Sequence, residues 1–197
     1  MQRRNNTKLV NFESSSLTMR RAAPNILITG TPGTGKTTLA ERVCEQVALT
    51  MISVNELVKS KGLHEGRDEE FDALVIDEDR VVDEMDDAMS LPSGGFCVDY
   101  HGCDFFPERW FDLVVVLRTD NTTLFDRLTA RGYSDKKRTE NIDAEIQQVL
   151  LDQARDSYAP DVVVELASCS VDDLDANVQQ IADFVRQWLA VQHDEQQ

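Results

Sequence analysis

Positive charge is scarce in this sequence, and several features that would assign it to other protein classes are missing. The 197 residues carry 20 lysines and arginines against 36 aspartates and glutamates, a net charge of −16. This negative net charge argues against a protein that binds nucleic acid over its whole surface. No apolar run approaches the length of a membrane span, and the first residues lack the apolar core of a secretory signal. The four cysteines show no Cys-x-x-Cys spacing, so we expect reduced thiols in cytosol or nucleus.

The charge is also unevenly distributed along the chain. Residues 1–23 hold five basic side chains and one acid and show no apolar period, so they are predicted to form a disordered extension. The length of the remaining chain fits one domain, predicted at 24–192 and followed by a short tail at 193–197.

Apolar runs alternate with helix-like stretches throughout this predicted domain. Buried strands are predicted at 25–29, 50–53, 95–99, 113–118 and 161–166. Helical faces are predicted for Ile142, Ile146 and Val149, and for a longer stretch from Leu174 to Trp188. This alternation indicates an α/β fold of three layers, with a five-stranded, mostly parallel sheet between helices.

The residues from Gly30 to Thr37 fit the pattern G-x-x-x-x-G-K-[ST] in full. A predicted strand precedes them and a helix-like stretch follows, and that order forms a cradle for phosphates. Backbone N–H groups and the helix N-terminus favour an anion there. Lys36 adds a point charge for the outer phosphates, and Thr37 offers a hydroxyl to Mg²⁺. The predicted nucleotide-binding residues of this P-loop are Gly33, Thr34, Gly35, Lys36, Thr37 and Thr38.

A P-loop enzyme also needs a carboxylate at the end of a neighbouring strand to hold the water shell of Mg²⁺. Two runs compete for this role. The run from Ala73 to Ile76 ends at Asp77 and has the better apolar pattern, but Asp77 begins a dense acidic stretch. The shorter run from Phe96 ends at Asp99, which opens an irregular segment of the kind that carries function.

A basic cluster stands out against the acidic remainder of the chain. Arg127 and Arg131 are four residues apart on a helix predicted to begin near Asp120, so they share a face that can clamp phosphates. Lys136 and Lys137 are predicted to lie in a short connection before the next helix, as in a flap that closes over the nucleotide.

Together these residues resemble the adenylate kinase isoenzyme 6 family, also described as coilin-interacting nuclear ATPases. The resembling stretches are Pro24–Leu27, Gly30–Thr38, Asp77–Glu84, Val98–Phe111, Leu117–Asp120, Arg131–Tyr133 and Asn141–Ile142. The resemblance implies a P-loop core with an arm for a nucleoside monophosphate (NMP) from Ser53 to about Ile76. It also implies a short lid from Ala130 to about Glu140.

The resemblance further assigns roles at the predicted site. It makes Asp99 the metal-side acid instead of Asp77, and it makes His101 a residue that positions the attacking water or the metal shell. Lys59, Lys61 and Arg67 in the arm, with Arg109 outside it, are the cations offered to an AMP phosphate.

We therefore expect an ATP:AMP phosphotransferase that also hydrolyses ATP. Mg²⁺ would be held by Thr37 and Asp99, and catalysis would rest on Lys36, Asp99, His101, Arg127 and Arg131. A monomer that binds neither membrane nor nucleic acid strongly is expected.

The alternative is an ATP-hydrolysing assembly factor whose kinase activity is secondary. The resemblance implies a role in maturation of the small ribosomal subunit, in nucleus and cytoplasm, with a small-subunit ribosomal protein as partner. The acidic stretch from Asp77 to Asp87 would then face that basic partner.

Overall fold

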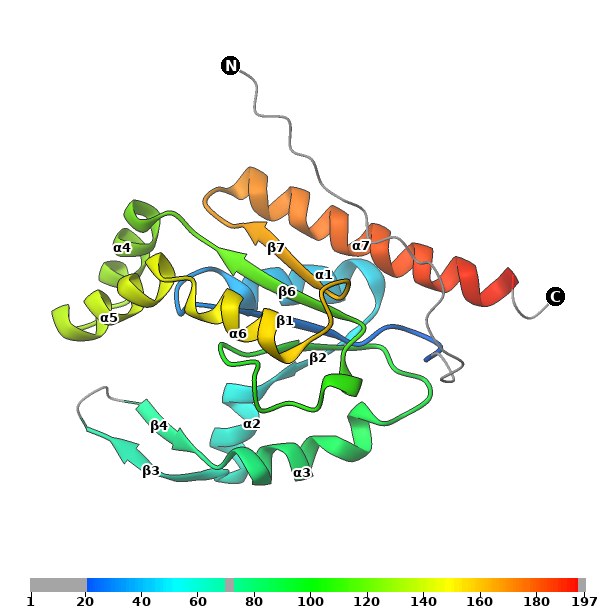
Figure 1. Cartoon of the computed structure of the whole chain (residues 1–197), viewed down its shortest axis with the longest axis horizontal. Helices are drawn as coiled ribbons and strands as arrows, with labels where there is room; N and C mark the ends of the chain where they lie inside the picture. Colours follow the sequence, from blue (N-terminus) through cyan, green and yellow to red (C-terminus); the bar gives the residue numbers. More distant parts are fainter. Residues whose placement is uncertain (1–20, 70–72, 195–197) are drawn as a thin grey trace, which may run out of the picture.

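The main sheet follows the alternating pattern of the sequence. A computed structural model of the chain describes residues 21–69 and 73–194. Its main sheet has five strands in the order β2-β5-β1-β6-β7, and all neighbouring pairs are parallel (Figure 1). The strands are β1 (Ile26–Gly30), β2 (Thr50–Ser53), β5 (Phe96–Asp99), β6 (Leu113–Arg118) and β7 (Val163–Ala167). The predicted α/β sheet is confirmed, with strand ends shifted by only one or two residues.

β1 is the central strand, and both of its faces are covered. Ile26, Leu27 and Ile28 are all 0% exposed, as expected for a parallel strand between two layers of helices. The carboxyl end of β1 lies beside that of β5, where Ile28 is aligned with Asp99. Ligands of open parallel sheets bind at this edge, so the sheet brings the two predicted motifs to a common place.

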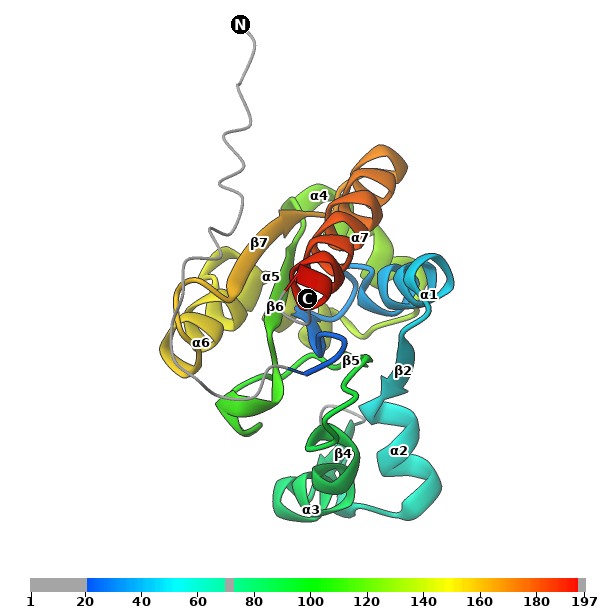
Figure 2. The ribbon, with the colours of Figure 1, turned by 90° about the vertical axis from the view of Figure 1, so that its right-hand side faces the viewer.

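Helices cover both faces of the sheet, so the molecule has three layers. α1 (Lys36–Val47) and α7 (Val171–Asp194) pack on one face. α3 (Glu78–Met89) and α6 (Val149–Ser157) pack on the other. Figure 2 shows α1 and α7 on one side of the sheet and α6 on the opposite side.

α7 is the longest of the described helices, with 24 residues. The core face predicted for it is confirmed. Its buried residues include Val178, Ile181, Val185 and Trp188. Over the described ranges, none of the helices combines the length and the apolar character needed to span a membrane.

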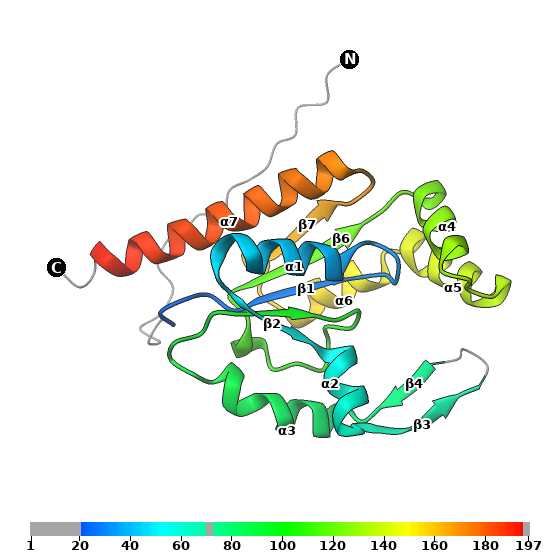
Figure 3. The ribbon, with the colours of Figure 1, turned by 180° about the vertical axis from the view of Figure 1, so that it is seen from behind.

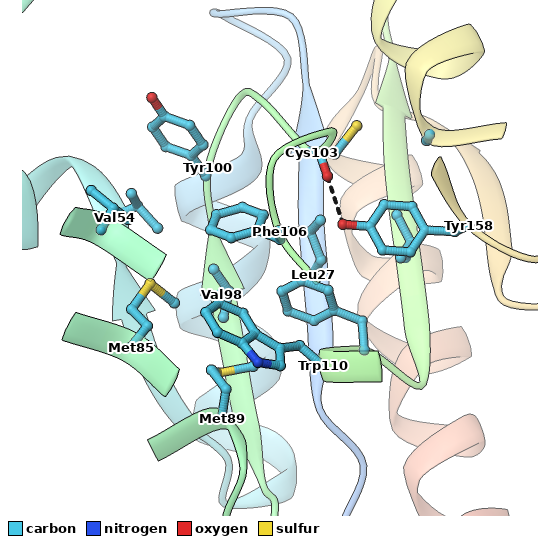
Figure 4. Packing of buried hydrophobic residues seen from close by; sticks show 14 of the residues in the cluster. Leu27, Val54, Met85, Met89, Val98, Tyr100, Cys103, Phe106, Trp110 and Tyr158 are labelled. Carbon is cyan, nitrogen blue, oxygen red and sulfur yellow. Dashed lines mark hydrogen bonds between the residues drawn. The ribbon is translucent and has the colours of Figure 1, made fainter. Parts of the chain in front are cut away.

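An aromatic cluster packs beneath the second face of the sheet (Figure 4). Trp110, in the short helix η1 (Glu108–Trp110), is fully buried, and its ring centroid lies 5.9 Å from that of Phe106. Tyr158 donates a hydrogen bond of 2.6 Å from its hydroxyl to the carbonyl oxygen of Cys103. These contacts fix the irregular segment that follows Asp99, and with it the backbone around the predicted site.

The segment predicted as an NMP arm forms a small substructure between β2 and β5. It comprises α2 (Val54–Lys61) and an antiparallel hairpin of β3 (His64–Asp68) and β4 (Ala73–Ile76). Figure 3 shows this hairpin at the same end of the molecule as α4 (Asn121–Ala130).

The pattern-based preference for Asp77 is wrong. The apolar run before it is β4, which pairs with β3 and not with the main sheet. Asp77 accepts a hydrogen bond of 3.2 Å from the backbone N–H of Arg80 and caps α3. A good apolar run ending in an acid therefore marks a helix start here, away from the P-loop strand.

The predicted flap is also different in form. The break after α4 is a short turn, and α5 (Asp135–Ile146) begins directly behind it, so Lys136 and Lys137 lie in a helix and not in a loop. The cause is a cap: the Ser134 hydroxyl accepts a hydrogen bond from the backbone N–H of Lys137. The apolar face predicted around Ile146 is wrong too, because Ile146 is 55% exposed and Val149 is 37% exposed.

The ends of the domain reach slightly beyond their predicted limits. Residues 1–20 and 195–197 lie outside the described residues, so most of the predicted N-terminal extension and part of the tail cannot be compared. Residues 21–23 belong to the domain, since Arg21 forms an ion pair of 3.1 Å with Asp112 and Ala23 bridges Gly94. At the other end α7 continues to Asp194.

Candidate nucleotide-binding site

The P-loop follows β1 directly and turns into α1 (Figure 1). Its turn depends on glycine, as Gly30 and Gly35 illustrate. Gly30 has φ +139°, and a Cβ there would lie 2.6 Å from the carbonyl oxygen of Leu117. Gly35 precedes α1 with φ +95°, a left-handed conformation that L-residues avoid. The turn leaves the N-terminus of α1 open toward the carboxyl edge of the sheet, as anion binding requires.

The remaining predicted P-loop residues divide into structural and outward-facing groups. Thr34 is fully buried, and its hydroxyl donates a hydrogen bond of 2.9 Å to the carbonyl oxygen of Thr31. Gly33 is buried as well, whereas Thr37 and Thr38 are exposed in the first turn of α1. The threonines available to a nucleotide are therefore those of the helix start.

Thr37 and Asp99 meet across the gap between α1 and β5. The Thr37 hydroxyl donates a hydrogen bond of 2.6 Å to a carboxylate oxygen of Asp99, which is 2% exposed. Both groups offer hard oxygen ligands of the kind that Mg²⁺ prefers. Within the described ranges no three side chains of His, Cys, Asp or Glu gather as a metal cage. This pair thus suits a Mg²⁺ ion that is carried mainly by phosphates and waters.

Lys36 lies in the fold of the P-loop. Its ammonium donates hydrogen bonds of 2.8 Å to the carbonyl oxygen of Gly30 and 3.1 Å to that of Thr31. Burial lowers the pKa of Lys36 to about 8, Asp99 and Glu145 partly offset this shift, and Arg131 adds to it. Lys36 is therefore mainly an ammonium at pH 7 and is half deprotonated at about pH 8.

This lowered pKa makes the capture of ATP sensitive to alkaline pH. Lys36 binds phosphate as an ammonium, and in the free enzyme it loses its proton as the pH rises through about 8. We expect kcat/KM for ATP to fall about tenfold per pH unit above that point. Bound phosphates raise the pKa, so kcat should decline only at higher pH. Steady-state rates from pH 6.5 to 10 test this, and a kcat/KM that stays flat through pH 9 would contradict it.

His101 lies two residues beyond Asp99, at the mouth of the site. Its backbone carbonyl accepts a hydrogen bond of 2.8 Å from the Thr29 hydroxyl, and its ring centroid lies 4.2 Å from that of Tyr100. The residue remains open to solvent on one side. Desolvation of the imidazole in the cleft lowers its pKa, and the positive charge of Lys36 lowers it further. The ring is therefore neutral near pH 7, which lets it accept a hydrogen bond from water.

The two predicted arginines lie differently. Arg127 turns toward the backbone: one nitrogen donates a hydrogen bond of 2.8 Å to the carbonyl oxygen of Ser168, and another donates one of 3.3 Å to that of Cys169. Arg131 is the C-cap residue of α4, is exposed, and lies near enough to Lys36 for its charge to act on that ammonium. Arg127 also donates a hydrogen bond of 3.4 Å to the carbonyl oxygen of Gly33. The structure thus brings Arg131 to the P-loop lysine and makes Arg127 a link between the P-loop backbone and the loop before α7.

A cavity of about 550 Å³ opens beside these residues, between the arm and the lid. Its size is in the range of small-molecule sites. Polar and cationic side chains around it include Lys59, Arg67, Tyr100, His101, Tyr133 and Lys137. The two other cations considered for the acceptor, Lys61 and Arg109, do not line this cavity, and they pair with Glu84 and Asp86 respectively.

A buried carboxylate that is not among the predicted site residues, Glu145, lies near the end of α5. It is 2% exposed and accepts a hydrogen bond of 2.6 Å from the Nε of Arg118, at the end of β6. The apolar pattern of its neighbours concealed it, since Ile146 looks like the core residue and is in fact exposed.

Known proteins resemble this chain in sequence and in fold. A family model described as an AAA domain matches residues 26–148. The chain is similar to an adenylate kinase isoenzyme 6 homolog of Dictyostelium discoideum, with 49% identity over 172 residues, 87% of this chain and 97% of the relative. A homolog of the same name from Caenorhabditis elegans is 46% identical over 164 residues, 83% of this chain and 90% of the relative. A solved shikimate kinase from Bacteroides thetaiotaomicron shares the fold, with a TM-score of 0.57 and 16% identity over 83% of this chain and 98% of that chain. With its P-loop and its parallel sheet, the chain belongs to the adenylate kinase isoenzyme 6 family.

Proposed function

We propose that this protein transfers the γ-phosphoryl group of ATP to AMP and, more slowly, to water. The observation that carries the proposal is the position of the cationic cavity next to the P-loop. His101 lines that cavity and also lies within electrostatic reach of Lys36, so the cavity wall and the P-loop lysine are close to each other. A second, phosphate-bearing substrate placed there would face the γ-phosphoryl group.

The roles follow from charge and position. Lys36 and Arg131 would balance the charge on the transferring group, while Thr37 and Asp99 would hold Mg²⁺, which neutralises the phosphates when bound with ATP. Phosphoryl transfer depends on positioning and electrostatics, so no nucleophilic side chain is required. Lys59 and Arg67, on the arm side of the cavity, are the cations placed to bind the AMP phosphate.

The direct test follows ATP consumption in the presence of Mg²⁺, with and without AMP, and separates phosphate release from ADP formation. The proposal expects close to two ADP per ATP consumed when AMP is present, and a slower reaction that gives one ADP and one phosphate per ATP when AMP is absent. Phosphate release that AMP leaves unchanged, without AMP-dependent ADP, would overturn the kinase and leave an ATPase.

The variant His101→Gly should separate the two activities. A neutral imidazole at this position can orient the attacking water, whereas AMP brings its own phosphate oxygen as nucleophile. We expect hydrolysis to fall roughly a hundredfold and AMP phosphorylation to fall less than about fivefold. Parallel assays of phosphate release and ADP formation measure the split. Equal losses in both activities would remove this role from His101.

We further propose that the protein serves assembly of the small ribosomal subunit, in nucleus and cytoplasm, through a basic ribosomal protein. The supporting observation is the acidic outer surface of α3, on which Glu78, Asp79, Asp83 and Asp87 are exposed. Its attraction for a basic partner would weaken steeply with salt. Titration with small-subunit ribosomal proteins at 50 and 300 mM salt tests this, and binding that salt does not weaken would argue against the surface.

A further inference from the structure

Glu145 is an unusual residue for its location. It occupies the last turn of α5, a helix whose other residues are all partly or fully exposed, yet it is itself 2% exposed. A buried carboxylate is unfavourable unless its oxygens are hydrogen-bonded and its charge is paired. Its partners therefore identify what the residue holds in place.

Those partners come from two parts of the nucleotide site. One carboxylate oxygen accepts a hydrogen bond from the hydroxyl of Thr31, in the P-loop. The other accepts hydrogen bonds from the Nε of Arg118, at 2.6 Å, and from the backbone N–H of Thr119, at 3.0 Å. Arg118 also donates one of 2.8 Å to the backbone carbonyl of Glu145, so the end of α5 is held at its side chain and its backbone.

The same contacts lead to the catalytic lysine. Thr31, which is 1% exposed, donates through its hydroxyl to Glu145, and its carbonyl oxygen accepts a hydrogen bond of 3.1 Å from Lys36. A shift of Thr31 would therefore displace one of the groups that hold the ammonium.

α5 also connects this point to the cavity. Its 12 residues extend about 18 Å as one rigid element. Lys137, in its first turn, lines the cavity, and Glu145, in its last turn, contacts the P-loop. One helix thus joins the wall of the acceptor site to the phosphate cradle.

We propose that Glu145 is a positioning residue that anchors α5 to the P-loop through Thr31 and so sets the place of Lys36. The proposal rests on the proposed phosphoryl transfer for its rate readout. Loss of the Thr31–Glu145 hydrogen bond would leave the active-site groups present but displaced, and small displacements of that kind are costly in rate.

The test compares Thr31→Val, Glu145→Gln and the double variant in the full-length protein. Thr31→Val removes only the hydroxyl donor and leaves the pair of Glu145 with Arg118 intact, so the protein should still fold. Its unfolding temperature should fall, because one buried carboxylate oxygen loses its donor, and the rates are measured on the folded protein. We expect each single variant to lower kcat about tenfold and to change KM for AMP less than twofold. Glu145→Gln also removes the charge that pairs with Arg118, so it should be the slower single variant. The double variant should be no slower than Glu145→Gln alone, because loss of the carboxylate already weakens the hydrogen bond that Thr31→Val removes.

Glu165→Gln is the matched control. Glu165 is the second carboxylate near Arg118, at 3.5 Å, and half of its side chain faces solvent, at 44% exposure. Its loss should leave kcat within twofold of the wild type.

Two results would overturn the proposal: a kcat of Thr31→Val within twofold of the wild type, or rate losses that multiply in the double variant. A residue with only a structural role would lower the unfolding temperature and leave the kcat of the folded protein intact. The kcat of ATP hydrolysis is measured alongside AMP phosphorylation. If the wild type fails to phosphorylate AMP, the proposed kinase function fails, and the same comparison on hydrolysis still decides the role of Glu145.

Discussion

Replacement of Lys36 by alanine is expected to lower AMP phosphorylation and ATP hydrolysis together, by roughly a thousandfold. Both reactions develop charge on the same γ-phosphoryl group, and Lys36 is the P-loop ammonium that lies within reach of Asp99 and Arg131. Its hydrogen bonds to the carbonyl oxygens of Gly30 and Thr31 show that the side chain folds back into the loop and does not extend to solvent. Its removal would leave the developing charge without its nearest point charge.

Initial rates of both reactions at saturating Mg²⁺-ATP measure this loss. Arg42→Ala is a suitable control on the same helix, since Arg42 is an exposed cation that pairs with Asp175 on the surface. Its rates should stay within twofold of the wild type. A Lys36→Ala variant that lost one activity and kept the other would show that the two reactions use different phosphate sites.

The variant Asp99→Asn is expected to lower both activities roughly a hundredfold and to weaken the dependence on Mg²⁺. Asparagine retains the shape of aspartate and an oxygen that can accept the hydrogen bond from Thr37, so the fold should be preserved. The negative charge that holds the metal side of the nucleotide would be lost. Rates measured across a Mg²⁺ titration should therefore show both a lower plateau and a higher midpoint.

Asp77→Asn provides the matched comparison. Asp77 is the acid that the apolar pattern favours, but it caps α3, and asparagine caps helices equally well. Its rates should remain within twofold of the wild type. A loss confined to Asp77→Asn would show that the acidic helix, and not the strand end at Asp99, serves the metal, and similar losses in both variants would remove the distinction between the two acids.

These two acids also show which parts of the site the sequence predicts. The P-loop is local: strand, glycine turn and helix follow one another, so the motif and its setting predict Lys36 and Thr37 directly. The metal-side acid depends on which strand lies next to β1, and that is a pairing between distant segments. Apolar pattern alone could not distinguish β4 from β5, because a short run in a hairpin looks like a short run in a parallel sheet.

Glu145 shows a second limit of prediction from the sequence. Periodicity identifies a core face by its apolar residues, and a buried carboxylate with three hydrogen-bond donors breaks that rule. The start of α5, by contrast, carries a signal in the sequence, namely its capping serine. Ser134 stands three residues before Lys137, which is the spacing of a helix cap, although the stretch was predicted to be a connection.

The strand order has a consequence for the nascent chain. Leu27 is aligned with Val98, 71 residues later in the chain, and with Val114, 87 residues later, so the central strand gains its neighbours only after these distant segments have been synthesised. Glu145, which secures the P-loop from α5, arrives later still. Pairing over such sequence distances is slow, and an unpaired apolar strand is prone to aggregate. The P-loop therefore leaves the ribosome before β5, β6 and α5, the elements that complete its phosphate-binding conformation.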